Sequence, residues 1–181
     1  MTMMLQRLVL TLCLLALPQA TTAQEAVADP GEQKRLALEY LGALADADWE
    51  KQKTFYTDES VFEDPTADLF GEPWRLSGAD EITDFWRTNY ESSGTLGVVN
   101  TFDRIFVNGS RVILVYEARV RFDGVQVGFP GEQLEGTIQG VTVLRIEGGK
   151  VLHHLDHVDY AGAQRDLEAM RADLEARSTS P

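Results

Sequence analysis

Apolar residues recur every three or four positions in the first half of the chain, the spacing of one face of a helix. This spacing predicts helices at residues 31–47, 49–56 and 77–93. Between the second and third of them, the pattern predicts a short strand at 60–63 and a loop at 66–76. The helices are amphipathic, so each has one face to bury against another element.

From Gly94 onward the period of the apolar residues falls to two, which is typical of half-buried strands. Four long strands and a last helix are predicted, at 98–107, 111–123, 133–147, 150–160 and 161–177. Asn108-Gly109 and Gly148-Gly149 mark tight hairpin turns. Helices followed by a long antiparallel sheet form an α+β order. We therefore expect one domain, in which the helices cover the concave face of a curved sheet and leave a pocket.

The N-terminus has the pattern of a cleavable secretory signal peptide. Residues 1–23 contain an apolar run, Leu8–Leu17, that is too short to span a bilayer, and small residues precede a predicted cleavage before Gln24. An uncleaved membrane anchor is the alternative. The protein is thus expected to be secreted or periplasmic. The predicted divisions are a signal peptide at 1–23, a disordered leader at 24–30, a pocket domain at 31–160 and a C-terminal helix and tail at 161–181.

Charge and cysteine content exclude several functions. Aspartate and glutamate number 29 against 16 lysines and arginines, a net charge of −13. Such a chain repels phosphate backbones and anionic membranes, so we expect neither nucleic acid nor a membrane as a stable partner. The single cysteine, Cys13, lies in the predicted signal peptide. The mature domain therefore has no thiol for catalysis or metal binding.

Three segments resemble the nuclear transport factor 2-like superfamily, with its SnoaL-like, ketosteroid isomerase-like and limonene epoxide hydrolase-like branches. They are residues 40–49, residues 61–65 with 78–82, and residues 149–160. The resemblance implies a cone-shaped curved antiparallel sheet with three N-terminal helices enclosing a pocket. It implies no single activity, because this fold supports several reactions as well as non-catalytic binding.

Two branches of the superfamily suggest catalytic residues. By resemblance to ketosteroid isomerase, Tyr40 is the phenol donor to an oxyanion, Asp64 is the base, and Thr142 occupies the place of a second donor. By resemblance to the epoxide hydrolase and the SnoaL-like cyclases, Asp156 is a functional carboxylate. The epoxide hydrolase also has an arginine on a neighbouring strand. The best match here, Arg119, is predicted to face outward, so that mechanism is doubtful.

The last predicted strand carries further titratable residues. His154 lies two residues before Asp156 and shares its face, so the carboxylate could orient the imidazole ring. His153 and His157 occupy the opposite face, too far apart along the strand to hold one metal together. We therefore predict no metal and no cofactor. The expected substrate-binding residues, any of which could instead be ordinary core, are Phe62, Trp86, Tyr116, Thr142 and Val158.

The sequence thus predicts an exported pocket protein that carries out cofactor-free acid–base chemistry on a small hydrophobic substrate. The catalytic candidates are Asp64, Tyr40, Asp156 and His154. The alternative is a non-catalytic ligand-binding or dimerisation module of the same fold. A homodimer through the outer face of the sheet is also possible.

Overall fold

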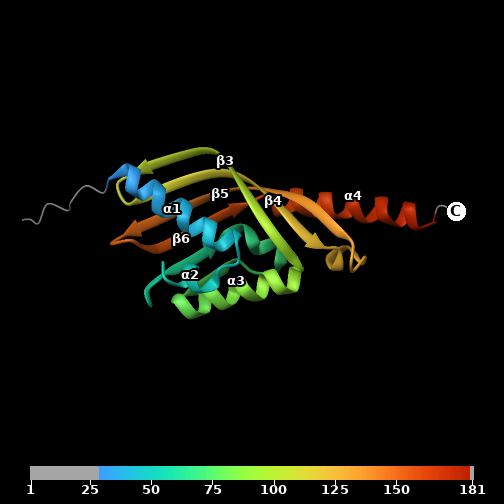
Figure 1. Ribbon diagram of the computed structural model, residues 1–181, viewed down its shortest axis with the longest axis horizontal. Coiled ribbons are helices and arrows are strands. Elements are labelled where there is room, and N and C mark those ends of the chain that lie inside the picture. The colour runs from blue at the N-terminus through green and yellow to red at the C-terminus, as the bar shows by residue number, and fades with distance from the viewer. Residues whose placement is uncertain (1–28, 180–181) are drawn as a thin grey trace, which may run out of the picture.

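The computed structural model describes residues 29–179 (Figure 1). It confirms the α+β class. The N-terminal half contains the helices α1 (Pro30–Ala45), α2 (Trp49–Lys53) and α3 (Ala79–Ser93), the short strands β1 (Val61–Asp64) and β2 (Trp74–Ser77), and the 3₁₀ helix η1 (Pro65–Phe70). The second half contains the long strands β3 (Thr95–Asn108), β4 (Arg111–Asp123), β5 (Gln133–Glu147) and β6 (Lys150–Val158), the 3₁₀ helix η2 (Val125–Val127) and the last helix α4 (Tyr160–Thr179).

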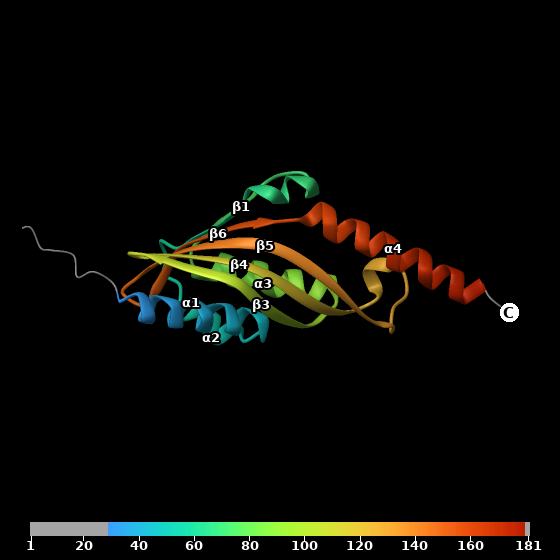
Figure 2. The same cartoon turned by 90° about the horizontal axis from the view of Figure 1, so that it is seen from above.

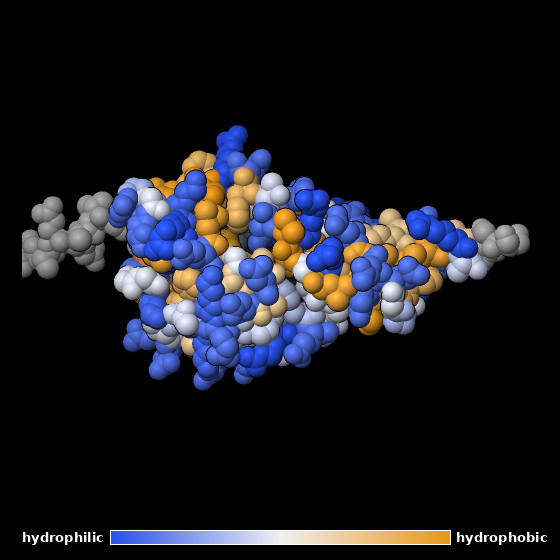
Figure 3. Space-filling model, in the orientation of Figure 1, coloured by the Kyte–Doolittle hydropathy of each residue, from blue (hydrophilic) through white to orange (hydrophobic). Residues whose placement is uncertain are grey.

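The six strands form one curved, unclosed sheet in the order β2-β1-β6-β5-β4-β3. All neighbours are antiparallel except β1 and β6, which run parallel with Phe62 opposite His154. In Figure 2, α3 lies behind the strands and α1 and α2 lie beside them, whereas α4 continues from β6 beyond the end of the sheet. The space-filling view shows that the lower part of the molecule, over α2 and α3, is mostly hydrophilic (Figure 3).

Alternation along β4 determines which side chains enter the core. Val112 and Leu114 are fully buried, whereas Arg111 and Arg119 are exposed on the opposite face. This is the arrangement that the period of two predicts. The inner side chains of β4 to β6 pack against the apolar faces of α1 and α3, and this packing forms the core.

The beginning of α1 explains one difference from the predicted boundaries. Asp29 caps the helix by accepting a hydrogen bond from the Gly31 amide at 2.9 Å, and Pro30 occupies the first turn. The helix therefore begins inside the predicted leader at 24–30. The predicted signal peptide at 1–23 and its cleavage before Gln24 lie outside the described residues. Between residues 29 and 179, no helix combines the length and the apolar character that crossing a membrane requires.

Three other predictions differ from the structure. The predicted loop at 66–76 contains most of η1 and most of β2, and β2 pairs with β1 at the edge of the sheet. A strand of four residues beside a proline is too short to show a clear alternation. The strand β3 also begins earlier than predicted. Tyr160, predicted to end a strand, instead begins α4, whose first turn is capped by Asp159 through the Gly162 amide.

Candidate functional site

A cavity of about 610 Å³ lies between the concave face of the sheet and the helices α1, α3 and α4. Its walls are mainly apolar and aromatic. The strand β4 contributes the inward side chains Tyr116, Ala118, Val120 and Phe122, and the first turns of α4 close one side with Ala163, Leu167 and Met170. This volume is in the range of pockets that hold drug-sized molecules.

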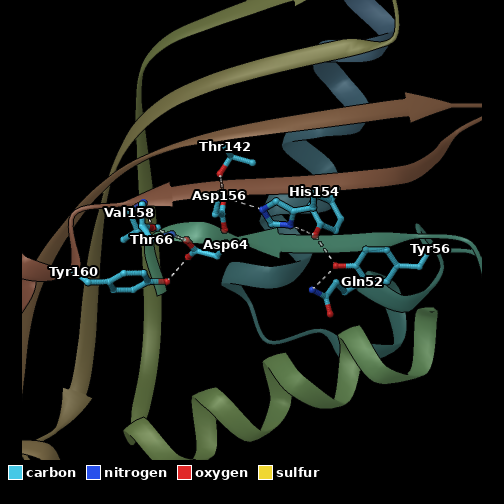
Figure 4. Close-up of polar contacts among 10 residues, drawn as sticks. Gln52, Tyr56, Asp64, Thr66, Thr142, His154, Asp156, Val158 and Tyr160 are labelled. Atoms are coloured by element: carbon cyan, nitrogen blue, oxygen red, sulfur yellow. Dashed lines mark hydrogen bonds and ion pairs between the residues drawn. The ribbon is translucent and has the colours of Figure 1, made fainter. Parts of the chain in front are cut away.

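Three polar residues gather on one wall of the cavity, on β5 and β6. Thr142 pairs with Asp156 in the sheet register, and its hydroxyl donates to Asp156 Oδ1 at 2.5 Å. His154 Nε2 lies 2.9 Å from the same oxygen (Figure 4). Asp156 Oδ2 has no partner among the described residues. The carboxylate is therefore held by one oxygen and leaves the other for a ligand, although the residue is only 5% exposed.

A buried chain of hydrogen bonds holds His154 from behind. The Gln52 amide donates to the Tyr56 hydroxyl at 3.3 Å, the hydroxyls of Tyr56 and Tyr40 lie 2.5 Å apart, and the Tyr40 hydroxyl lies 2.6 Å from His154 Nδ1. Burial raises the pKa of Tyr40 well above its usual value, and the neighbouring Tyr56 raises it further. Tyr40 therefore remains a neutral phenol.

We assign the tautomer of His154 from both of its ring contacts. The Asp156 carboxylate beside Nε2 favours a proton there, and Nδ1 then accepts from the Tyr40 hydroxyl, which in turn accepts from Tyr56. The ring proton of a neutral His154 then lies on Nε2, on the side of Asp156. Trp86 stacks near this ring, with centroids 6.1 Å apart, and keeps its plane fixed.

We predict that nitrogen NMR will find His154 Nδ1 unprotonated near neutral pH. Tyr40→Phe removes the proton donor to Nδ1 and should allow the other tautomer to be populated. His157, which is exposed on the opposite face of β6, is the internal control and should not change. An Nδ1–H signal in the wild-type protein would contradict this assignment.

Asp64 lies behind the cavity wall. Its Oδ1 accepts from the Thr66 amide at 2.9 Å and the Thr66 hydroxyl at 2.5 Å, and its Oδ2 accepts from the Tyr160 hydroxyl at 2.6 Å (Figure 4). Thr66 Oγ1 in turn accepts from the Val158 amide, so its own proton must point to Asp64. Asp64 is fully buried and is not among the residues that line the cavity, whereas Tyr160 is.

Tyr116 presents a second phenol to the cavity. Its ring lies over Gly140, where a Cβ atom would approach the Tyr116 hydroxyl to 2.7 Å. Gly140 faces Val158 in the sheet, two residues from Asp156. Burial raises the pKa of Tyr116, and the negative charge of Asp156 raises it further. The phenol is therefore protonated at neutral pH and can donate a hydrogen bond to a ligand.

The residues singled out from the sequence fall into two groups. Trp86, Tyr116, Thr142, His154, Asp156 and Val158 line the cavity. Tyr40, Asp64 and Phe62 lie fully buried behind its wall, where each supports a residue that does line it. The sequence pattern does not reveal two further residues of the site. Tyr56 follows the end of α2, where the chain has no apolar period, and Tyr160 is the last residue of the predicted strand at 150–160.

The charges of the cavity wall differ from those of an epoxide hydrolase site. Arg119 and Arg121 are exposed on the outer face of β4, as the alternation predicts. Within residues 29–179, no group of three histidine, cysteine or acidic side chains is arranged to hold a metal ion. His153, on the outer face, instead contacts Glu63 at 2.7 Å.

Comparison with known proteins identifies the family. The sequence profile of the SnoaL-like domain matches residues 37–154. The chain belongs to the SnoaL-like family. No curated protein matches this SnoaL-like sequence.

Solved structures share the same fold. A candidate SnoaL-like polyketide cyclase from Shewanella putrefaciens is 28% identical, with a TM-score of 0.66 over 77% of this chain and 97% of that one. One from Shewanella denitrificans is also 28% identical, with a TM-score of 0.67 over 76% and 98% of the two chains. An epoxide hydrolase of the limonene type from Mycobacterium tuberculosis is 17% identical, with a TM-score of 0.63 over 83% and 99%, and this likeness concerns the fold alone.

Proposed function

We propose that this SnoaL-like protein is an acid–base enzyme that moves a proton next to a carbonyl group of a small hydrophobic molecule. The observation that carries the proposal is the geometry of Asp156. One of its oxygens is held by Thr142 and faces His154, and the other has no partner among the described residues of an apolar cavity. A carboxylate in such surroundings is a suitable general base.

The proposed reaction uses two groups of the cavity wall. Asp156 Oδ2 takes a proton from the carbon beside the carbonyl, the electron pair of that C–H bond forms a C=C bond to the carbonyl carbon, and the π electron pair of the C=O bond moves to the oxygen. The Tyr116 hydroxyl donates a hydrogen bond to this oxygen as its charge develops. Return of the proton from Asp156 to another carbon completes an isomerisation, with no atom gained or lost. No cofactor takes part in these steps.

Other residues have positioning roles in this proposal. Thr142 holds Oδ1 of Asp156 by a hydrogen bond, Nε2 of His154 faces the same oxygen, and the Tyr40 hydroxyl contacts Nδ1 of His154. Asp64, expected from the sequence to be the base, holds the Tyr160 hydroxyl instead, because both of its oxygens already accept hydrogen bonds inside the wall. The base role therefore passes to Asp156 in the proposal.

Deuterium exchange tests the proposal without knowledge of the natural substrate. The protein is incubated in heavy water with a panel of neutral cyclic ketones, and the loss of the protons beside the carbonyl is followed by NMR. We expect at least one ketone to exchange faster than in buffer, and Asp156→Asn to remove this acceleration. If ketones bind in the cavity and none exchanges, the protein is a binding module.

Export is part of the proposal. The pattern of residues 1–23 supports secretion, with the cavity domain acting outside the cytoplasm. The protein recovered from the periplasm or the medium should begin at Gln24, within a residue or two. Intact Met1 on membrane-bound protein would contradict export by a cleaved signal.

We also propose a homodimer through the outer face of the sheet. An apolar ladder crosses four strands of this face, with Phe106 beside Ile113, Ile113 beside Val143, and Val143 beside Leu155. Phe106 is 50% exposed and the others are half-buried, so a second copy would remove apolar surface from water.

Sedimentation velocity should find a dimer that Val143→Glu dissociates, because a carboxylate would be buried at the centre of this face. Ser92→Glu adds the same charge to an exposed position of α3, away from the outer face of the sheet, and should leave the dimer intact. A wild-type monomer, or a dimer that tolerates Val143→Glu, would contradict this interface.

A further inference from the structure

The charged groups of the cavity wall are all of one sign. Asp156 and Asp166 line the cavity, and Asp64 lies directly behind the wall, against Tyr160. Among the described residues that line the cavity, none is a lysine or an arginine. The basic side chain of the wall, His154, has Nδ1 against Tyr40 and Nε2 against Asp156. A negatively charged ligand would therefore meet no cation to offset its desolvation.

The negative charge of these carboxylates affects the pKa values of two phenols of the wall, those of Tyr116 and Tyr160. Asp156 and Asp64 both contribute to raising the pKa of Tyr116, and the same two carboxylates raise that of Tyr160. In both phenols burial is the largest cause. A negative charge placed on a ligand between these phenols would be disfavoured in the same way, and a positive charge would be favoured.

Aromatic rings at one side of the cavity add to this preference. Phe70 and Trp74 stack with centroids 5.6 Å apart, and Tyr160 lies 5.0 Å from Phe70 and 5.9 Å from Trp74. Phe70 is 61% exposed, so this cluster lies at the surface of the cavity. Tyr160 donates its proton to the Asp64 carboxylate, which increases the electron density of its ring. Faces of such rings attract cations.

We infer that Asp156 also determines which ligands enter: the cavity accepts neutral and positively charged hydrophobic molecules and excludes hydrophobic anions such as carboxylates. A lipophilic amine, with its ammonium group at Asp156 Oδ2 and its apolar body against Trp86 and Tyr116, binds more tightly than its neutral counterpart. The inference rests on the proposed function in one respect, which is that the ligand binds in the cavity beside Asp156. It restricts the substrate class to neutral or cationic carbonyl compounds.

Three probes of one shape test this selectivity by calorimetry at neutral pH: a naphthyl-methylamine, the matching naphthyl-methanol and the matching naphthoate. We expect the amine to bind about tenfold more tightly than the alcohol, as one charged hydrogen bond provides, and the naphthoate to bind at least about tenfold more weakly than the alcohol. The amine should also inhibit ketone exchange competitively. If the wild-type protein binds the naphthoate as tightly as the amine, the inference is overturned, and no variant is needed to show it.

Variants then identify the responsible carboxylate. Asp156→Asn should remove the preference for the amine and leave the affinity for the alcohol within about twofold. Thr142→Val keeps the charge of Asp156 and should keep the preference. Asp58→Asn, at an exposed position outside the residues that line the cavity, is the matched control for loss of one charge. A preference for the amine that survives Asp156→Asn would overturn the role of this residue.

The outcomes separate selectivity from catalysis. If the probes bind in the expected order of affinity, amine before alcohol before naphthoate, and no ketone exchanges, the charge selection is supported and the proposed reaction is contradicted. Exchange of ketones together with equal binding of amine and naphthoate would support the reaction and overturn the charge selection.

Discussion

Asp156→Asn should slow the deuterium exchange of a responsive ketone by about 10²–10⁴-fold, the usual contribution of a positioned general base. Asparagine has nearly the same shape and keeps an oxygen that can accept from Thr142, but its amide cannot take a proton from carbon. The exchange rate and the melting temperature are measured on the same preparations. The melting temperature should change little, because Asp156 Oδ2 has no partner to lose among the described residues.

Two further variants make this result specific. Tyr116→Phe removes the proposed oxyanion donor and should slow exchange by about 10²–10³-fold. Asp58→Asn removes a carboxylate from an exposed position outside the residues that line the cavity and should leave the rate within about twofold. An Asp156→Asn protein that remains folded and exchanges ketone as fast as the wild type would refute the assignment of the base.

Asp64→Asn, in contrast, should cost about 3 kcal/mol of unfolding free energy, because hydrogen bonds to a charged group contribute about 1.5–3 kcal/mol each. The Asp64 carboxylate accepts from two donors of Thr66 and from the Tyr160 hydroxyl, and it is fully buried. An amide in its place turns an NH₂ group toward one of these donors. In a domain of this size the loss corresponds to a fall of roughly 6–12 °C in melting temperature.

Tyr160→Phe is the matched control, because it removes one of the three donors and keeps the carboxylate. We expect a smaller loss, about 1–2 kcal/mol. Chemical denaturation of the three proteins gives both differences. An Asp64→Asn protein as stable as the wild type, but without exchange activity, would restore Asp64 as the base.

The alternation of β4 shows what the sequence could predict. Every second residue from Val112 to Phe122 is apolar, and all of these side chains lie on the concave face, while Arg119 lies outside. The period of apolar residues along a strand is a local property, so it can be read without knowing which elements pack against that strand. For the same reason, the shared face of His154 and Asp156 followed from their spacing alone.

The position of Asp64 shows why other features could not be predicted. Its place at the end of β1 was expected to bring it to the cavity. The 3₁₀ turn that follows, however, brings the Thr66 amide and hydroxyl to one of its oxygens. Tyr160, from far along the chain, takes the other oxygen. Neither the turn type nor a contact across so long a stretch of sequence can be read from an apolar period.

The parallel pairing of β1 with β6 has a consequence for how the protein folds. Tyr40 and His154 are separated by 114 positions, and Asp64 and Tyr160 by 96. Each contact must wait until a long loop has closed, and such closure is slow. During synthesis, α1 to α3 and β3 to β5 can assemble before the segment from His153 to Tyr160 has left the ribosome. The last strand to be made therefore completes the buried hydrogen-bond chain, and a nascent chain interrupted before it lacks the cavity wall that carries His154 and Asp156.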